Sequence, residues 1–394
     1  MSNLPDLSGK TILQVIPALD AGGAERAVVD MADAITRAGG TALVASEGGR
    51  LEDELSDVCG ELIELPVARK NPVTLFQNKT RIEQLIDGRG IDLVHARSRA
   101  PAWSALWAAE KTRTPFVTTY HGAYSGNGFW PKKFYNSVMA RGDLIIANSG
   151  WTGAHVRDTH EIDNDRIVVI PRGVNFAEFN PDLVDERRVK LLRRHWGIGD
   201  DNNRILALLP ARLTRWKGQL LALEALRELS EEERGELVLV MIGDSQGRKS
   251  FVREIEKTIA QYGLVECTRV AGHCRDMPAA LKAADMVLVP SLKPEAFGRV
   301  AAEAAAMGRP VIAANHGGAR ETVIDGETGA MFEPGSANSL AACIRSLVSI
   351  GPVARGGMGQ IGRQHVLQSF SRDRLQVATL SVYSALIAQG KPTT

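Results

Sequence analysis

Residues 286–314 read MVLVPSLKPEAFGRVAAEAAAMGRPVIAA, and the pattern within them decides the fold. Two apolar runs, residues 286–290 and 310–314, have the length of buried strands, and an alanine-rich helix is expected between them. Apolar strands that are separated by helices are typical of a parallel sheet covered on both faces. The stretch therefore predicts an α/β protein built on a parallel sheet.

The same alternation of apolar runs and helical patterns continues on both sides of this stretch. The second half of the chain carries further expected strands at residues 205–210, 237–242 and 268–271. Between the two halves, residues 179–201 are polar and charged, and they mark the best domain boundary in the chain. The strands expected in the first half are residues 11–17, 41–46, 62–65, 92–95, 116–120, 144–147 and 167–170.

Composition excludes several classes of function. The 394 residues carry 47 Lys and Arg against 46 Asp and Glu, so no global field favours a nucleic acid partner. No apolar run reaches the ~20 residues that span a bilayer, and the N-terminus lacks a signal-peptide pattern. The four cysteines have no paired spacing and indicate a reducing compartment. We therefore expect a cytoplasmic protein, with peripheral contact at the inner face of a membrane still open.

Candidate ligand-binding side chains are expected in the loops after the strands, because open parallel sheets bind ligands at the carboxyl ends of their strands. Arg212 and Lys217 follow the strand at residues 205–210 and precede a helix that starts near Gln219. An Arg fork and a Lys point charge beside a helix N-terminus suit a diphosphate. Two solvated surface cations are the alternative interpretation, and spacing alone weighs the two about equally.

The opening stretch places two glutamates at the same edge. Glu295 lies in the loop after Pro294, and Glu303 lies on the alanine-rich helix, where a carboxylate needs a partner. Sugar hydroxyls would suit Glu295, ribose hydroxyls would suit Glu303, and the free N–H groups at residues 297–300 would face a phosphate. The alternative is a glutamate favoured by the helix dipole and a Glu303 paired to a core arginine.

Paired glycines mark two more loops. Gly317 and Gly318 follow the strand at residues 310–314 and indicate a close approach of the backbone. Gly22 and Gly23 follow the first strand, but the third glycine of a dinucleotide-binding fingerprint is missing. Alone this second pair is a weak signal, and we interpret it as a flexible lip of a cleft.

In their order and spacing, these motifs closely resemble glycosyltransferase family 4, a retaining family with the GT-B fold. The resemblance covers most of residues 205–335 and extends more loosely into the first half. One mild departure is Arg172, where family members commonly have Asn. The matching residues are Arg212, Lys217-Gly218, Gly243-Asp244, Gly272, Pro290-Ser291, Glu295, Phe297-Gly298, Glu303-Ala304, Gly308, Pro310-Val311, Gly317-Gly318, Glu321, Gly326 and Thr328-Gly329, with residues 22–25, 120–122, 147–149 and 170–175 in the first half.

The resemblance implies an α/β protein of the GT-B type, with two Rossmann-like domains whose parallel sheets face each other across a cleft. We expect an N-terminal acceptor-side domain at residues 1–180, a linker at residues 181–203 and a donor-binding domain at residues 204–370. Residues 371–394 would form a terminal helix that packs back on the N-terminal domain.

The resemblance also implies a role for each candidate residue. Arg212 and Lys217 would hold the donor diphosphate and stabilise its charge on departure. Glu295 and the backbone of residues 297–299 would hold the transferred sugar, Glu303 would hold the nucleotide ribose, and His121 would contact a hydroxyl of the reacting sugar. The expected donor-binding set is completed by Gly22, Gly23, Gly243, Asp244, His273, Phe297, Gly298, Arg299 and Val300, with His273 beside the nucleotide base.

No metal ion or other cofactor is expected. Asp163-Asn164-Asp165 has the Asp-x-Asp spacing of metal-dependent transferases, but it lies at the amino end of the strand at residues 167–170. That is the wrong edge for a site, so we interpret it as a turn. His155 and His160 are five residues apart on an expected helix and do not share a face.

The predicted function is transfer of a sugar from a nucleotide-diphosphate donor to a glycan or lipid-linked acceptor. Cell-envelope polysaccharide or lipopolysaccharide synthesis is the expected context. Residues 123–135 (AYSGNGFWPKKFY) would suit a lipid-linked acceptor at a membrane surface, although a structured loop with core aromatics is the favoured interpretation. A nucleotide-sugar epimerase of the same fold is the alternative. A dinucleotide-dependent oxidoreductase is disfavoured by the missing fingerprint, and a non-catalytic nucleotide-binding module by the full set of charged residues.

Overall fold

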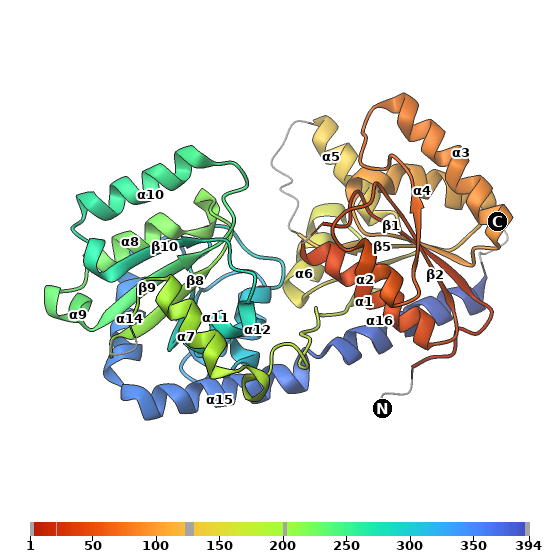
Figure 1. The fold of residues 1–394 in the computed structure, drawn as a ribbon. Coiled ribbons are helices and arrows are strands. Elements are labelled where there is room, and N and C mark those ends of the chain that lie inside the picture. Colours follow the sequence, from red (N-terminus) through yellow and green to blue (C-terminus); the bar gives the residue numbers. More distant parts are fainter. Residues whose placement is uncertain (1–3, 21, 123–129, 200–202, 391–394) are drawn as a thin grey trace. The chain divides into compact units, whose positions relative to one another are not determined.

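A computed structural model describes residues 4–20, 22–122, 130–199 and 203–390 of the protein. The chain divides into two compact units, each with its own parallel sheet (Figure 1). Unit 1 comprises Met1–Gly173 and Arg372–Thr394, and unit 2 comprises Val174–Ser371. The expected α/β class with two parallel sheets is confirmed.

The sheet of unit 1 has seven strands in the order β3-β2-β1-β4-β5-β6-β7, and all its pairings are parallel. The order reverses between β1 and β4, and open α/β sheets bind ligands at such a reversal. The strands are β1 (Thr11–Val15), β2 (Thr41–Ser46), β3 (Glu61–Glu64), β4 (Leu93–Ala96), β5 (Phe116–Tyr120), β6 (Leu144–Ala147) and β7 (Ile167–Val169).

Helices cover both faces of this sheet, since alternate strand residues point to opposite sides. On one face Leu13 and Val15 pack with Ile82 of α3 and Trp103 of α4. On the other face lie α1 and α16, which run side by side in Figure 1 and bury Tyr383 in the core. The helices are α1 (Gly23–Arg37), α2 (Glu52–Asp57), α3 (Pro72–Arg89), α4 (Arg99–Thr112), α5 (Trp130–Ser137), α6 (Gly150–His160) and α16 (Arg372–Gln389), with 3-10 turns η1 (Val138–Ala140) and η2 (Asn164–Arg166).

The sheet of unit 2 has six parallel strands in the order β10-β9-β8-β11-β12-β13. Its order reverses between β8 and β11, so the loops after these two strands flank the expected ligand position. The strands are β8 (Ile205–Pro210), β9 (Leu237–Ile242), β10 (Thr268–Gly272), β11 (Met286–Val289), β12 (Val311–Ala314) and β13 (Gly329–Phe332). The last strand was not predicted, because four residues with a leading glycine give no apolar run.

Two layers of helices enclose this second sheet. Leu206 and Leu208 pack on the layer that contains α12, and Ala207 and Leu209 pack on the layer that contains α8. Within the described residues no single helix is long and apolar enough to cross a membrane; α14 and α15 pass that test only together, bent by 110°. The helices are α7 (Glu186–His195), α8 (Gln219–Arg227), α9 (Glu231–Gly235), α10 (Lys249–Gln261), α11 (Met277–Ala283), α12 (Arg299–Ala306), α13 (Ala319–Thr322), α14 (Ala337–Ser349) and α15 (Gly351–Ser369), with 3-10 turns η3 (Pro181–Leu183), η4 (Arg215–Lys217) and η5 (Val265–Cys267).

The segment expected as a linker, residues 181–203, carries η3 and α7. Val184, Val189, Trp196 and Ile198 are buried in the core of unit 2, and α7 packs on α11. The polar character of the segment comes from the exposed face of α7, which is why its sequence resembles a linker. The terminal helix α16 is tied to α1 by Gln376, whose Nε2 donates to the Asp30 carbonyl oxygen at 2.7 Å.

Candidate active site

Three loops of unit 2 meet at Glu295. Lys217 comes from the 3-10 turn after β8, and its Nζ lies 2.7 Å from Glu295 Oε1. The two side chains are only 12% and 13% exposed, so each charge is largely withdrawn from water and depends on the other. Lys217 Nζ also lies 4.3 Å from the centre of the Trp216 ring, a cation–π distance.

Two residues that the sequence analysis did not assign complete this cluster. Ser291, two residues after the end of β11, donates its hydroxyl to Glu295 Oε1. His316, after β12, lies with Nε2 2.8 Å from the Ser291 carbonyl oxygen. Because a carbonyl only accepts, the Nε2 atom of His316 carries the proton in this bond. Both residues stand near strand ends, which was the available signal, but only the fold brings Ser291 to Glu295 and His316 to Ser291.

Close packing of the loop after β12 fixes the backbone at Glu295. The Gly318 N–H donates to the Glu295 carbonyl oxygen at 2.8 Å. A Cβ on Gly317 would collide with that same oxygen, and one on Gly318 would collide with the backbone of residues 296 and 297. The paired glycines are therefore needed for loop packing, whatever they contribute to a ligand.

The N-terminus of α12 lies directly after this loop. Gly298 caps the helix with a left-handed φ of 84° and gives no side-chain hydrogen bond. The first backbone bonds of the helix run from Ala301 and Ala302 to the Gly298 carbonyl, which leaves the N–H groups of Arg299 and Val300 as the helix-terminal donors. The Phe297 side chain is buried and packs edge-on against Phe370, so only its backbone is left for a ligand.

Glu303, on α12, is 8% exposed and pairs with Arg299, whose Nε lies 3.0 Å from Oε1. Arg299 is 43% exposed, so it is not the core arginine that the alternative interpretation of Glu303 required. A ligand hydroxyl would therefore meet a carboxylate that already has one cationic partner.

The remaining expected donor-binding residues follow β8, β9 and β10. The Leu213 N–H donates to the Asp244 carbonyl at 3.0 Å, and the Gly243 N–H donates to the Gly272 carbonyl at 2.6 Å, so backbone bonds tie these loops together. The side chains of Arg212, Asp244 and His273 are exposed. In the described part of the chain, the Arg212 guanidinium has no hydrogen-bond or ion-pair partner, unlike the Lys217 ammonium.

In unit 1, His121 follows β5 and contacts an arginine. Arg172 Nη2 lies 2.8 Å from His121 Nδ1, and Arg172 Nη1 donates to the Gly23 carbonyl oxygen at 2.6 Å. Gly22 and Gly23 thus form the start of α1 beside His121. Burial, with the cations of Arg172 and Arg97, holds the pKa of His121 well below its usual range.

A buried polar cluster beneath these loops was not foreseen from the sequence. His95 Nδ1 lies 2.6 Å from the Tyr383 hydroxyl of α16, and its Nε2 lies 2.7 Å from the Thr119 hydroxyl. Arg97 donates to Gln14 Oε1 through Nε at 3.1 Å and Nη2 at 2.6 Å. Burial is the main cause that lowers the pKa of His95 well below its usual range. The cluster joins the C-terminal helix to the centre of the sheet.

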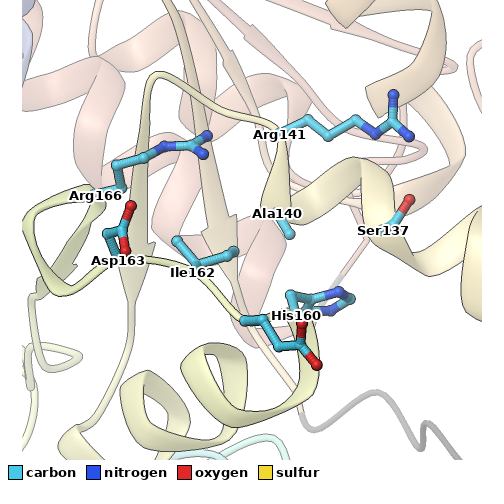
Figure 2. A pocket seen from close by; sticks show the side chains of 8 residues that line it. Ser137, Ala140, Arg141, His160, Ile162, Asp163 and Arg166 are labelled. Atoms are coloured by element: carbon cyan, nitrogen blue, oxygen red, sulfur yellow. The ribbon is translucent and has the colours of Figure 1, made fainter.

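The suspected metal motif lies elsewhere. Asp163-Asn164-Asp165 forms a turn at the amino end of β7, and Asp163 lines an open cavity of about 270 Å³ with Arg141 and His160 (Figure 2). His160 bonds the Tyr120 hydroxyl at 2.8 Å, whereas His155 stacks on Trp151. Across the described ranges, no three His, Cys, Asp or Glu side chains are grouped to hold a metal ion. Of the aromatic loop, residues 123–129 lie outside the described residues.

Similar structures define the class of protein. A glycosyltransferase from Rickettsia africae superimposes with a TM-score of 0.87 at 34% identity, over 96% of this chain and 99% of that chain. The HepE protein of Anabaena, solved in complex with UDP, superimposes with a TM-score of 0.82 at 24% identity, over 96% and 100% of the two chains. At that identity the similarity to HepE is evidence for the fold alone. The protein has the GT-B fold of glycosyltransferases.

Sequence matches then give the family. Residues 21–178 match the model of Glycosyltransferase Family 4, and residues 193–365 match that of Glycosyl transferases group 1. The chain is 30% identical to the D-inositol 3-phosphate glycosyltransferase of Xylanimonas cellulosilytica, over 74% of this chain and 72% of that protein. The protein belongs to glycosyltransferase family 4 and is a glycosyltransferase.

The buried histidines of unit 1 predict a loss of stability in acid. Their pKa values are lowered in the folded state, so the unfolded chain binds more protons once the pH falls below about 6.5. Each imidazole that stays neutral should then cost about 1.4 kcal/mol of unfolding free energy per pH unit. Urea unfolding between pH 7.5 and pH 5 should show this slope, and His95→Gln should reduce it. An unchanged slope in His95→Gln would contradict the assignment.

Proposed function

We propose that the protein is a retaining, metal-independent glycosyltransferase that moves a sugar from a nucleotide-diphosphate donor to a glycan or lipid-linked acceptor. The setting is cytoplasmic synthesis of cell-envelope polysaccharide or lipopolysaccharide. The observation that carries this proposal is the Lys217–Glu295 pair at 2.7 Å, placed beside the N-terminus of α12. One group suits a phosphate and the other suits a sugar hydroxyl, at the strand reversal of one sheet.

The electrostatics of unit 2 support the departure of a diphosphate without a metal ion. Breaking the bond between sugar and phosphate leaves negative charge on the diphosphate, and preorganised cations and N–H groups stabilise it. Lys217, the exposed Arg212 and the N–H groups of Arg299 and Val300 supply these donors. When a diphosphate takes the Lys217 ammonium, the Glu295 carboxylate is released to accept from hydroxyls of the transferred sugar.

In this proposal the anomeric configuration is retained by front-face attack, because no side chain is assigned as the nucleophile of a double displacement. Glu295 Oε1 is engaged by Lys217 and Ser291, which suits binding better than attack on carbon. The acceptor hydroxyl then attacks from the face that the diphosphate leaves. The departing phosphate oxygen takes the proton of that hydroxyl, so neither an enzyme carboxylate nor a metal-bound water is required. Glu303 holds the ribose hydroxyls, and His121 contacts a sugar hydroxyl.

The acceptor side of the proposal includes contact with an anionic membrane surface. Phe76, Trp107, Trp103 and Phe134 form an aromatic row across α3, α4 and α5, with ring centres 5.3, 5.6 and 5.1 Å apart. Phe76 and Phe134 at its two ends are 61% and 53% exposed. Exposed cations lie close in sequence to both ends: Arg69 and Lys70 precede α3, and Lys132 and Lys133 lie on α5. Exposed rings flanked by cations suit the interface of a negatively charged bilayer.

Replacing both ends of the aromatic row tests this contact. Phe76→Ser with Phe134→Ser should weaken binding to vesicles of phosphatidylglycerol and phosphatidylcholine about tenfold or more, because apolar burial is lost. Co-sedimentation of the purified protein measures the effect. Val353→Ser, which removes an 88% exposed valine of unit 2, is the control and should bind as the parent does. If the parent protein does not co-sediment with anionic vesicles, the proposed membrane contact is refuted.

A nucleotide screen tests the donor class. UDP, GDP, ADP and CMP are each added to the protein, with and without EDTA, and the melting temperature is measured. A nucleoside diphosphate at 100 times its Kd should stabilise the folded state by about 2.7 kcal/mol. The shift should survive EDTA, since the phosphate donors are protein groups. No shift with any nucleotide would defeat the proposal, and a shift that EDTA removes would defeat metal independence.

Single substitutions test the two central side chains. Lys217→Ala and Glu295→Ala should each lower kcat/KM by a factor of about 100 or more, the scale for losing one preorganised donor. Lys293→Ala changes an exposed lysine of the same loop and should keep parental activity. Radiolabelled sugar transfer measures turnover, and thermal melting checks the fold. Near-parental turnover in either Lys217→Ala or Glu295→Ala would show that the site is misassigned.

A further inference from the structure

Arg172 connects three segments at the carboxyl edge of the unit 1 sheet. It lies in the segment after β7, His121 lies directly after β5, and Gly23 begins α1 after β1. One guanidinium nitrogen, Nη2, lies 2.8 Å from His121 Nδ1, and the other, Nη1, donates to the Gly23 carbonyl oxygen at 2.6 Å. One planar group thus sets the position of the histidine relative to the Gly22-Gly23 turn.

The position of the proton on His121 follows from this contact. A guanidinium stays protonated and has no acceptor, so Nδ1 must offer its lone pair to Arg172. A neutral imidazole that accepts through Nδ1 carries its proton on Nε2. The ring is neutral near pH 7 because burial, Arg172 and Arg97 lower the pKa of His121 well below its usual range.

The Nε2–H group of His121 is then a hydrogen-bond donor that needs an acceptor. Its nitrogen is buried and finds no hydrogen-bond partner among the residues that the structure describes. A buried donor without a partner is costly and rare, and it calls for an explanation such as a ligand. A hydroxyl oxygen is an acceptor of suitable size, and it is the group that the proposed reaction brings.

We infer that Arg172 is a positioning residue that locks His121 in the Nε2–H tautomer, so that His121 donates to a hydroxyl oxygen of the transferred sugar. The assignment of that oxygen rests on the proposed function. The tautomer itself does not. The opposite tautomer would place an N–H against the guanidinium and a lone pair toward the sugar. Asn, common in the family at this position, is uncharged and too short to duplicate both contacts of Arg172.

The tautomer can be measured without any substrate. Two-bond proton–nitrogen correlation spectra of protein labelled with ¹⁵N-histidine distinguish Nε2–H, Nδ1–H and doubly protonated rings, and His121→Gln assigns the signal. At pH 7 the parent should show the Nε2–H form. Arg172→Met should give a mixture of tautomers and a higher midpoint of His121 titration, since among the described residues Arg97 and His95 still act on the ring but the Arg172 cation does not. A parent ring in the Nδ1–H form, or an unchanged signal in Arg172→Met, overturns the inference.

Two further variants distinguish this positioning role from a nonspecific disturbance of the fold. Arg172→Lys keeps a cationic donor and should retain the Nε2–H form, and it serves if Arg172→Met does not fold. Arg166→Met is the matched control: this arginine also flanks β7, but it donates to the Gly142 carbonyl at 2.7 Å at the amino end of the strand. It should leave both the tautomer and the activity unchanged. If Arg172→Lys shows the Nδ1–H form, or Arg166→Met shifts the tautomer, the positioning role is wrong.

Kinetics test the sugar contact. Arg172→Met and His121→Gln should each lower kcat/KM for transfer 10- to 100-fold, and the double variant should be no worse than His121→Gln, because the two residues act through one group. The melting shift given by the bound nucleotide should be unchanged. Additive losses would refute the shared role. A parent that transfers no sugar but shows the Nε2–H form refutes the proposed function and leaves the tautomer lock standing.

Discussion

Most candidate residues of this protein depend on one topological constraint. Parallel strands all end at the same edge of their sheet, so each connection to the following helix must leave from that edge. Lys217, Glu295 and His316 follow three neighbouring strands, β8, β11 and β12, and therefore meet although 99 positions of sequence separate the first from the last. The reversal of strand order between β8 and β11 opens a position between their loops. The candidate site of unit 2 is assembled by this geometry.

The Lys217–Glu295 ion pair is stable because each of its two charges has a partner. Both side chains are nearly withdrawn from water, and a partly buried charge without a counter-charge would cost several kcal/mol. Ser291 adds a donor to the carboxylate, and the Trp216 ring faces the ammonium. In the proposed reaction, an incoming diphosphate replaces Glu295 as the partner of Lys217, and sugar hydroxyls replace Lys217 as partners of Glu295. Donor binding, as proposed, therefore exchanges one satisfied set of contacts for another and leaves neither charge without a partner.

The fold was predictable from local pattern, whereas the pairings in the site were only partly so. Long apolar runs such as residues 205–210 mark strands because burial on both faces demands them. Strand β13 gives no such run and was missed. Lys217 and Glu295 were identifiable by residue type and by their place after strands, but their mutual bond depends on side-chain direction. The bond between His95 and Tyr383 joins residues 288 apart in sequence, and no periodicity indicates it.

Each unit places a positive charge beside a different kind of partner. In unit 2 the Lys217 ammonium lies against a carboxylate. In the proposed reaction, an anionic ligand takes the place of that carboxylate. In unit 1 the Arg172 guanidinium lies against an imidazole, and a cation beside an imidazole favours the uncharged ring. In the proposed reaction the sugar gains positive charge as the diphosphate leaves. An imidazolium would repel that charge, whereas a neutral N–H donor holds the sugar hydroxyl without opposing it.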